Sequence, residues 1–316
     1  MAEKLVVSSS PHIKTPESVE FIMRDVLIAL IPPFAVSLWL WGVQSLYMVM
    51  VAVVVAMLTE TLLIYKSVSL EKIKGDWSAA VTGVLFGLSL PPATPWWIVA
   101  TGAFVAIAIG KQLFGGLGYN IFNPALVGRA FVVISWPAHM THWTPPFEQV
   151  DATTTATPLA VAADFVGEGF IDAFSRYDLF IGTVPGSVGE TSVLAILIGG
   201  VFLIYKGHID IRVPLGFMGT VAVIALITGS DIVYHLMSGS ALFAAVFMAT
   251  CMVTSPLTKT GKLIFGIGCG FFTVLFRLFG EIPEGVTYAV LLMNALVPFI
   301  DKFTVPKIYG EVSEQK

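Results

Sequence analysis

The chain has 316 residues, of which 56% are hydrophobic and only 12% are charged, and its mean hydropathy is +0.86. Soluble globular proteins are about 45–50% apolar and about 25% charged, so this composition excludes an ordinary soluble domain. The formal net charge of -4 shows no basic excess, and we expect no nucleic-acid partner. Cys251 and Cys269 lie in apolar runs without metal-ligand spacing, so neither a disulfide framework nor a metal site is expected.

Apolar segments recur along the sequence, and many approach the about 20 residues that a transmembrane helix needs. Several are short and contain Gly or Pro, which is typical of broken or tilted helices buried in a bundle. We place ten of them, five on each side of a long polar stretch, at 26–41, 45–65, 79–90, 96–110, 122–136, 192–205, 213–228, 240–251, 263–279 and 286–300. The sequence therefore predicts an all-α integral membrane protein of about ten transmembrane helices.

The positive charges fall almost entirely on one side of this arrangement. If the polar N-terminal segment is cytosolic, its side of the membrane holds 14 of the 17 Lys and Arg residues. These are Lys4, Lys14, Arg24, Lys66, Lys72, Lys74, Lys111, Lys206, Arg212, Lys259, Lys262, Lys302, Lys307 and Lys316. Because cytosolic loops are enriched in Lys and Arg, we expect both termini in the cytoplasm, no cleavable signal sequence, and the long polar stretch outside.

The two halves of the predicted bundle resemble one another. In each half, a short apolar run ending at Pro precedes one span, a glycine-bearing turn and a last span that contains Asn. Five spans per half invert the second half, and inverted repeats with broken helices place ligand sites near the membrane midplane. We expect two inverted five-helix repeats joined by an extracytoplasmic loop, with cytosolic segments at both ends, over residues 1–25, 26–136, 137–190, 191–300 and 301–316.

The polar stretch contains the run Asp151-Ala-Thr-Thr-Thr-Ala-Thr-Pro158. Pro158 disfavours helical backbone at Thr157, so Thr157 is expected to be extended on a connector. No His or Lys lies within the run to activate a hydroxyl as a nucleophile. Two interpretations stay open at this point: a plain Thr-rich loop, or a threonine displayed so that a group can be attached to it.

The densest motif is Gly110-Lys-Gln-Leu-Phe-Gly-Gly-Leu-Gly-Tyr-Asn-Ile-Phe-Asn-Pro-Ala-Leu-Val-Gly-Arg129. Its glycines allow close backbone approach, and Asn120 and Asn123 can both donate and accept hydrogen bonds, as an amide-rich heterocycle requires. Arg129 falls inside a predicted span, where a charge is costly unless it is paired or meets an anion. The alternative is a tight inner turn with an Asn cap and a snorkelling Arg.

The motif Lys111-x-x-Phe-Gly-Gly-Leu-Gly-x-Asn-x-Phe-Asn-Pro-Ala, followed by the Thr run, resembles the D-subunit family of the Rnf complex. That family is related to the B subunit of the sodium-pumping NADH:quinone reductase. The blocks Pro185-Gly-Ser-Val-Gly-Glu-Thr-Ser192 and Pro283-Glu-Gly-Val-Thr-Tyr-Ala-Val-Leu-Leu-Met-Asn294 fit as well. The resemblance covers nearly the whole chain, with the motifs in the family's order.

The resemblance implies that FMN is joined through its phosphate to a threonine hydroxyl. Thr157 occupies the acceptor position of the matching motif Thr154-Thr155-Ala156-Thr157. A separate flavin transferase makes this bond outside the cytoplasm, the side on which the charge distribution places the loop. Thr153, Thr154 and Thr155 are then expected to serve recognition or spacing.

The resemblance also implies a second, noncovalent flavin in the membrane, such as riboflavin. Asn120 and Asn123 are expected to hydrogen-bond its isoalloxazine, with Arg129 nearby. A hydrocarbon core about 30 Å thick is a long way for an electron leaving one outer-face flavin, so a second carrier is expected on physical grounds too. The protein would position the rings and tune their potentials.

Two positions bear on ion movement. Glu60 lies in the second predicted span, where a carboxylate is expensive and suggests a function such as an ion path; the alternative is a hydrogen-bonded strut near the inner end. The family commonly has Ala-Thr-Asp-Pro where this sequence reads Ala249-Thr250-Cys251-Met252. An ion path that needs this acid is therefore not expected in the same form.

We thus expect a subunit of an Rnf-type ion-translocating ferredoxin:NAD oxidoreductase in a bacterial or archaeal cytoplasmic membrane, relaying electrons through flavins while the complex pumps Na⁺ or H⁺. The sequence contains neither a nicotinamide fingerprint nor iron–sulfur cluster ligands, so the other active sites belong to partner Rnf subunits. One alternative is a channel or transporter for a small polar solute without a redox cofactor. Another is a membrane scaffold in which Arg129 and the asparagines merely join helices.

Overall fold

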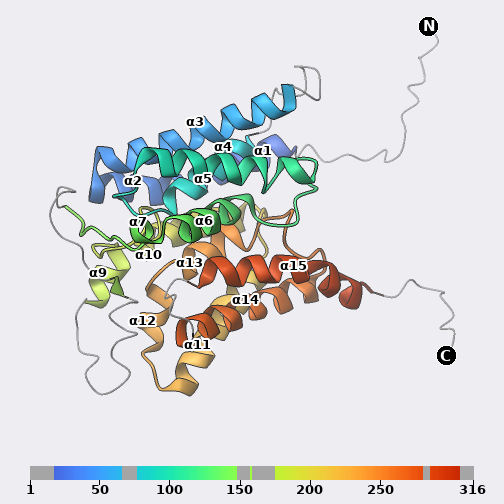
Figure 1. The fold of residues 1–316 in the computed structure, drawn as a ribbon. Coiled ribbons are helices and arrows are strands. Elements are labelled where there is room, and N and C mark those ends of the chain that lie inside the picture. The colour runs from blue at the N-terminus through green and yellow to red at the C-terminus, as the bar shows by residue number, and fades with distance from the viewer. Residues whose placement is uncertain (1–17, 66–76, 148–156, 159–174, 280–284, 307–316) are drawn as a thin grey trace, which may run out of the picture.

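The computed structural model describes residues 18–65, 77–147, 157–158, 175–279 and 285–306, and every regular element in these ranges is a helix (Figure 1). In chain order the elements are α1 (Val19–Ala29), α2 (Ile31–Trp41), α3 (Val43–Tyr65), α4 (Ser78–Leu88), α5 (Trp96–Ala108), the turn η2 (Gln112–Phe114), α6 (Pro124–Ser135), α7 (Pro137–Met140), α9 (Arg176–Ile181), α10 (Val193–Tyr205), α11 (Arg212–Thr228), α12 (Ile232–Met237), α13 (Ala241–Phe243), the π-helical turn η3 (Ala244–Met248), α14 (Lys259–Phe279) and α15 (Val286–Thr304).

Each of the ten predicted apolar segments contains a helix. Five helical stretches in the described part of the chain are long and apolar enough to cross a membrane: Val19–Trp41, Val43–Ile64, Trp96–Phe114, Lys259–Phe279 and Val286–Thr304. The shorter apolar helices are α4, α6, α10 and α11. The prediction of an all-α, multi-pass membrane protein with broken helices is confirmed.

The first span consists of two helices. Ser18 caps α1, because its hydroxyl accepts a hydrogen bond from the backbone N–H of Phe21. α1 therefore begins at Val19, before the predicted start at residue 26, and Asp25 lies within it rather than in the preceding segment. The break to α2 at Leu30 precedes two prolines, which have no N–H to continue the helical ladder.

The short helices α4 and η3 end inside the protein, where their freed backbone groups need partners. After α4, the carbonyl oxygens of Leu88 and Leu90 accept hydrogen bonds from the backbone N–H groups of Gly189 and Val188, at 2.7 and 3.0 Å. After η3, the carbonyl of Met248 accepts from the side chain of Asn123. Each broken helix of one half is thus completed by residues outside its own repeat.

The two halves form two layers, with α1–α5 above and α11, α14 and α15 below in Figure 1. Corresponding helices pack in corresponding ways. In the first half α3 packs on α4 and α5, and α5 on α6; in the second, α11 packs on η3 and α14, and α14 on α15. The layers meet where α6 contacts α15 and where α1 and α2 contact α10.

Close helix packing depends on small residues at two of these contacts. A Cβ added to Gly199 of α10 would lie 2.2 Å from the carbonyl oxygen of Ala29 in α1. A Cβ on Gly266 of α14 would lie 2.5 Å from the carbonyl oxygen of Val213 in α11. Such contacts let helix backbones approach closely, which is how helices associate in lipid.

The start of α1 and the end of α15 lie at the same end of the bundle, at the right of Figure 1. α9 and α12 lie at the opposite end, and both belong to connections outside the apolar spans. The side of the membrane on which each end of the bundle lies stays a prediction.

Candidate functional site

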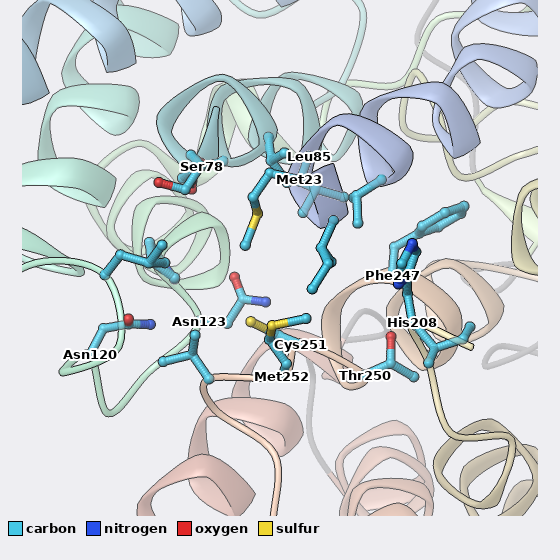
Figure 2. A pocket seen from close by; sticks show the side chains of 18 of the residues that line it. Met23, Ser78, Leu85, Asn120, Asn123, His208, Phe247, Thr250, Cys251 and Met252 are labelled. Carbon is cyan, nitrogen blue, oxygen red and sulfur yellow. Dashed lines mark hydrogen bonds between the residues drawn. The ribbon is translucent and has the colours of Figure 1, made fainter. Parts of the chain in front are cut away.

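A cavity lies between the two halves, with an empty volume of about 780 Å³ that includes space open to its surroundings. The walls come from α1, α4, the turn before α6, the α10–α11 connection and the region around η3. Most lining residues are apolar, and polar groups include Ser78, Asn120, Asn123 and His208 (Figure 2).

Asn123 joins the two halves. Its Oδ1 accepts from the backbone N–H of Ala125 at 3.0 Å, which caps α6, and its Nδ2 donates to the carbonyl of Met248 at 3.1 Å. The backbone N–H of Asn123 donates to Oδ1 of Asn294 on α15, whose Nδ2 donates to the carbonyl of Thr254. The amide of Asn123 is therefore occupied by protein groups, as in the alternative of an Asn cap.

Asn120 differs from Asn123. Its side chain is 5% exposed, and its Nδ2 donates to the carbonyl of Phe122 at 3.1 Å. Its Oδ1 is buried and finds no hydrogen-bond donor among the residues that the structure describes. Because buried acceptors are nearly always satisfied, this atom stands out among the polar groups of the residues that line the cavity.

Lys111 also lines the cavity and holds Glu60 beside it. Its Nζ lies 2.5 Å from Oε1 of Glu60 and also donates to Oγ of Ser78. Gln112 donates to the same Glu60 oxygen at 3.0 Å. The Lys111 side chain is 2% exposed and that of Glu60 12%, so the charge inside the span is paired, as a buried carboxylate requires. The geometry is that of the hydrogen-bonded strut; a role of Glu60 in an ion path stays a prediction.

Arg129 is not among the residues that line this cavity, and the expectation that it lies near a flavin bound by the two asparagines stays a prediction. Its Nη1 lies 2.5 Å from Oε1 of Glu190, and its Nη2 lies 3.5 Å from Oγ of Ser187. The Arg129 and Glu190 side chains are 4% and 3% exposed. A charge within the span is thus neutralised by an acid from the α9–α10 connection.

Thr157 lines a second hollow, to which Glu190 also contributes. It is 5% exposed, and this smaller hollow, about 340 Å³ of empty volume, is also lined by Met237 and Gly239. The hydroxyl of Tyr234 donates to the carbonyl of Pro158. Burial raises the pKa of Tyr234 to about 12, so this hydroxyl keeps its proton at neutral pH and holds the Thr157–Pro158 segment. The neighbouring threonines 153–155 lie outside the described residues.

The other wall of this hollow is organised by Arg277, which donates to the backbone carbonyls of His235 and Ser238. Burial lowers the pKa of His235, and the nearby Arg277 charge lowers it further. Asp231 caps α12 by accepting from the backbone of Val233 and Tyr234. These contacts fix the segment 237–239 against Thr157.

Sequence reasoning missed the partners of the buried charges. Glu190 stands in a motif that the sequence showed, but nothing in the motif indicated that its carboxylate is buried. Asp25 and His208, which pair at the edge of the cavity, resemble ordinary loop residues near predicted span ends. Their spacing along the chain, like that of Glu60 and Lys111, gives no signal of contact.

Fold and sites together define a multi-pass helical membrane protein with a mainly apolar cavity between its halves and a buried threonine beside α9 and α12. The chain belongs to the NQR2, RnfD, RnfE family, whose model matches residues 6–310. The described residues contain no cluster of His, Cys, Asp and Glu that could hold a metal ion.

Curated relatives match almost end to end. The chain is 46% identical to the D subunit of the Na(+)-translocating ferredoxin:NAD(+) oxidoreductase complex of Acetobacterium woodii, over 99% of this chain and 97% of the relative. It is 41% identical to the D subunit of the proton-translocating ferredoxin:NAD(+) oxidoreductase complex of Clostridium ljungdahlii, over 96% of each. It is 35% identical to the D subunit of the ion-translocating oxidoreductase complex of Halorhodospira halophila, over 96% of this chain and 94% of the relative.

Proposed function

We propose that this chain is the flavin-carrying D subunit of an Rnf-type complex, in which electrons pass between ferredoxin and NAD while Na⁺ or H⁺ is translocated. The relatives' names give the complex and its ion translocation, and their match over nearly the full chain supports carrying both over. The remaining subunits, including those with FMN and iron–sulfur clusters, would supply the donor and acceptor sites. The chain lies in the cytoplasmic membrane with both termini in the cytoplasm, as its charge distribution favours.

The observation that carries the redox part of the proposal is the position of Thr157. It lines a hollow with residues of α9 and α12 and with Glu190, the partner of Arg129, and it precedes Pro158, which Tyr234 holds. FMN would be attached to its hydroxyl as a phosphoester by a flavin transferase. The absence of His and Lys from the Thr run 151–158 suits attachment by a separate enzyme.

A second, noncovalent flavin would occupy the cavity between the halves. Apolar walls suit a planar ring system, and the buried acceptor Oδ1 of Asn120, which finds no donor among the described residues, suits a ring N–H. When bound, a flavin supplies a centre that accepts and releases electrons one or two at a time. The protein's own part is to bind the rings, orient them and exclude water from them.

Within this proposal, Asn120 and Asn123 have different roles. Asn120 contacts the ligand, and Asn123 holds the turn that carries Asn120 against the second half. Lys111 presents a cation to the cavity wall, and Glu60 balances it. Glu60 is also the acid that we keep as a proposed member of the ion path. The relatives named above include one complex that translocates Na⁺ and one that translocates H⁺. The proposal therefore includes both ions.

The competing function is a transporter for a small polar solute, for which inverted repeats and a central cavity are equally suitable. The mainly apolar lining of the cavity favours a flat hydrophobic ring over such a solute. The two functions differ in a directly visible property, because only the redox protein is coloured.

The test is intact mass and in-gel flavin fluorescence of the purified chain, co-expressed with a flavin transferase. Wild type is expected to carry one FMN-phosphoester increment, and Thr157→Ala none. Thr144→Ala is a matched control, because Thr144 is also a buried threonine outside the apolar spans. Fluorescence that survives in Thr157→Ala would move the acceptor to a neighbouring threonine, and a colourless wild type would favour the transporter.

A further inference from the structure

Asp25 and His208 form a buried pair at the end of the cavity remote from Asn120. Nε2 of His208 lies 2.8 Å from Oδ2 of Asp25, and each side chain is only 4% exposed. Asp25 belongs to α1, whereas His208 lies in the connection between α10 and α11. Figure 2 shows His208 and Asn120 at opposite sides of the same cavity. A titratable ring thus forms part of a wall that is otherwise mostly apolar.

Two basic side chains, Lys206 and Arg24, lie near the pair. Lys206 Nζ lies 3.6 Å from the same Asp25 oxygen, so this carboxylate already has a permanent cation beside it. The ring of Phe21 meets His208 edge-on at 6.3 Å, and the charges of Arg24 and Lys206 lie over the Phe21 ring.

Carboxylates farther away are engaged elsewhere. Asp210, on the same connection as His208, pairs with Arg212 and Lys262. Across the cavity, Glu60 balances Lys111. Protonation of His208 therefore adds a net positive charge to the cavity wall, with Asp25 as the carboxylate that it contacts.

We propose that His208 takes up a proton when an electron enters the ligand of this cavity, so that the wall gains positive charge as the ligand gains negative charge. This inference rests on the proposed noncovalent flavin. One electron passes from the redox partner to the ligand, and one proton from water binds Nδ1 of His208. The Nε2–H group keeps its hydrogen bond to Asp25, and no covalent bond between heavy atoms forms or breaks.

Two physical arguments support this role. Histidine can carry either a neutral or a cationic ring, so His208 can gain a positive charge without any change in its hydrogen bond to Asp25. Charges attract more strongly in a poorly hydrated cavity than in water, which couples the electron to the proton. Asp25 fixes the ring orientation and tautomer, because the neutral ring must donate from Nε2 to a carboxylate.

The experiment measures the midpoint potential of the noncovalent flavin against pH by spectroelectrochemical titration of the purified complex, between about pH 5 and 8. The potential is expected to fall as pH rises in wild type and to depend less on pH in His208→Gln, with flavin content unchanged. Glutamine keeps a donor for Asp25 and cannot take up the proton. His139→Gln, an exposed position on α7, is the matched control and should behave as wild type.

A slope in His208→Gln equal to that of wild type, with flavin bound, would overturn the role of His208 and leave the flavin site standing. A wild-type complex without noncovalent flavin would overturn both. If His208→Gln does not assemble, Asp25→Asn replaces it. Removing the counter-charge of the imidazolium is expected to move the pH-dependent range of the potential to lower pH, and an unmoved range contradicts the proposal.

Discussion

The guanidinium of Arg129 and the carboxylate of Glu190 form an ion pair at 2.5 Å, with both side chains almost fully buried. The pair joins α6 of the first half to the connection that leads into the second half. Removing one partner of a buried pair leaves an uncompensated charge, which typically costs about 3–5 kcal/mol. The two side chains therefore depend on each other, and Glu190 also lines the hollow that contains Thr157.

From this pair we predict that Glu190→Gln lowers the free energy of unfolding by roughly 3–5 kcal/mol. The measurement is thermal or denaturant unfolding in detergent. Asp231→Asn, which breaks the exposed pair with Arg176, is the comparison. It changes an ion pair worth about 0–1 kcal/mol, although it also weakens a helix cap. Equal effects of the two variants would contradict the assignment.

Substitutions of Asn120 and Asn123 are predicted to affect different properties, namely flavin binding and stability. Asn120→Leu removes the acceptor offered to the ligand and should reduce noncovalent flavin binding by about tenfold, or about 1.4 kcal/mol, with little loss of stability. Asn123→Leu removes a helix cap and a hydrogen bond between the halves, each worth about 1 kcal/mol, and should lower stability. Flavin content and melting temperature, measured for both variants, separate the two roles.

The two cysteines offer a direct probe of the cavity. Cys251 lines the cavity and is partly exposed, whereas Cys269 on α14 is 0% exposed. A small maleimide is expected to modify Cys251 and leave Cys269 unmodified, and bound flavin should slow the reaction. Mass spectrometry of the labelled peptides, with Cys251→Ser as the control, checks this. Labelling that flavin does not slow would argue against occupancy of the cavity.

A pH dependence is predicted for the segment that packs against Thr157. The pKa of His235 is lowered in the folded protein by burial and by Arg277, so the unfolded segment binds a proton more readily. Stability is therefore full above the unfolded value of about 6.5 and is lost progressively as pH falls below it. Hydrogen exchange over residues 232–239 should accelerate at acidic pH in wild type. His235→Gln should remove most of this dependence, and an equal acceleration in the variant would refute the assignment.

The sequence predicted the helices better than the contacts between them. Apolar length and the flanking prolines located all ten helical segments, because a chain in lipid must satisfy its backbone within each span. The start of α1 was placed too late, since Arg24 and Asp25 resemble a polar flank although Asp25 is buried against His208. Hydropathy counts charges without showing which distant partner neutralises them.

The same limit applies to the candidate sites. The sequence indicated Thr157, Asn120 and Asn123 as candidates because Pro or Gly residues lie beside them in recognisable motifs. Glu190 did not stand out, because an acid in a polar connection has no local pattern that shows burial. Asn123 lines the cavity, and its role toward a ligand stays a prediction. Its bond to the carbonyl of Met248 joins residues 125 apart along the chain, and no sequence pattern indicates such a contact.

The hydrogen bonds that Asn123 makes to Asn294 and to Met248 in the second half have a consequence for the biosynthesis of the protein. The first half supplies the amide that satisfies Met248 of the second, and the second supplies the Oδ1 that receives the backbone N–H of Asn123. While the ribosome is still making the second half, the first half sits in the bilayer with a donor that lacks its acceptor. Two fragments divided between residues 159 and 174 are therefore expected to associate in the membrane, and neither is expected to fold stably alone.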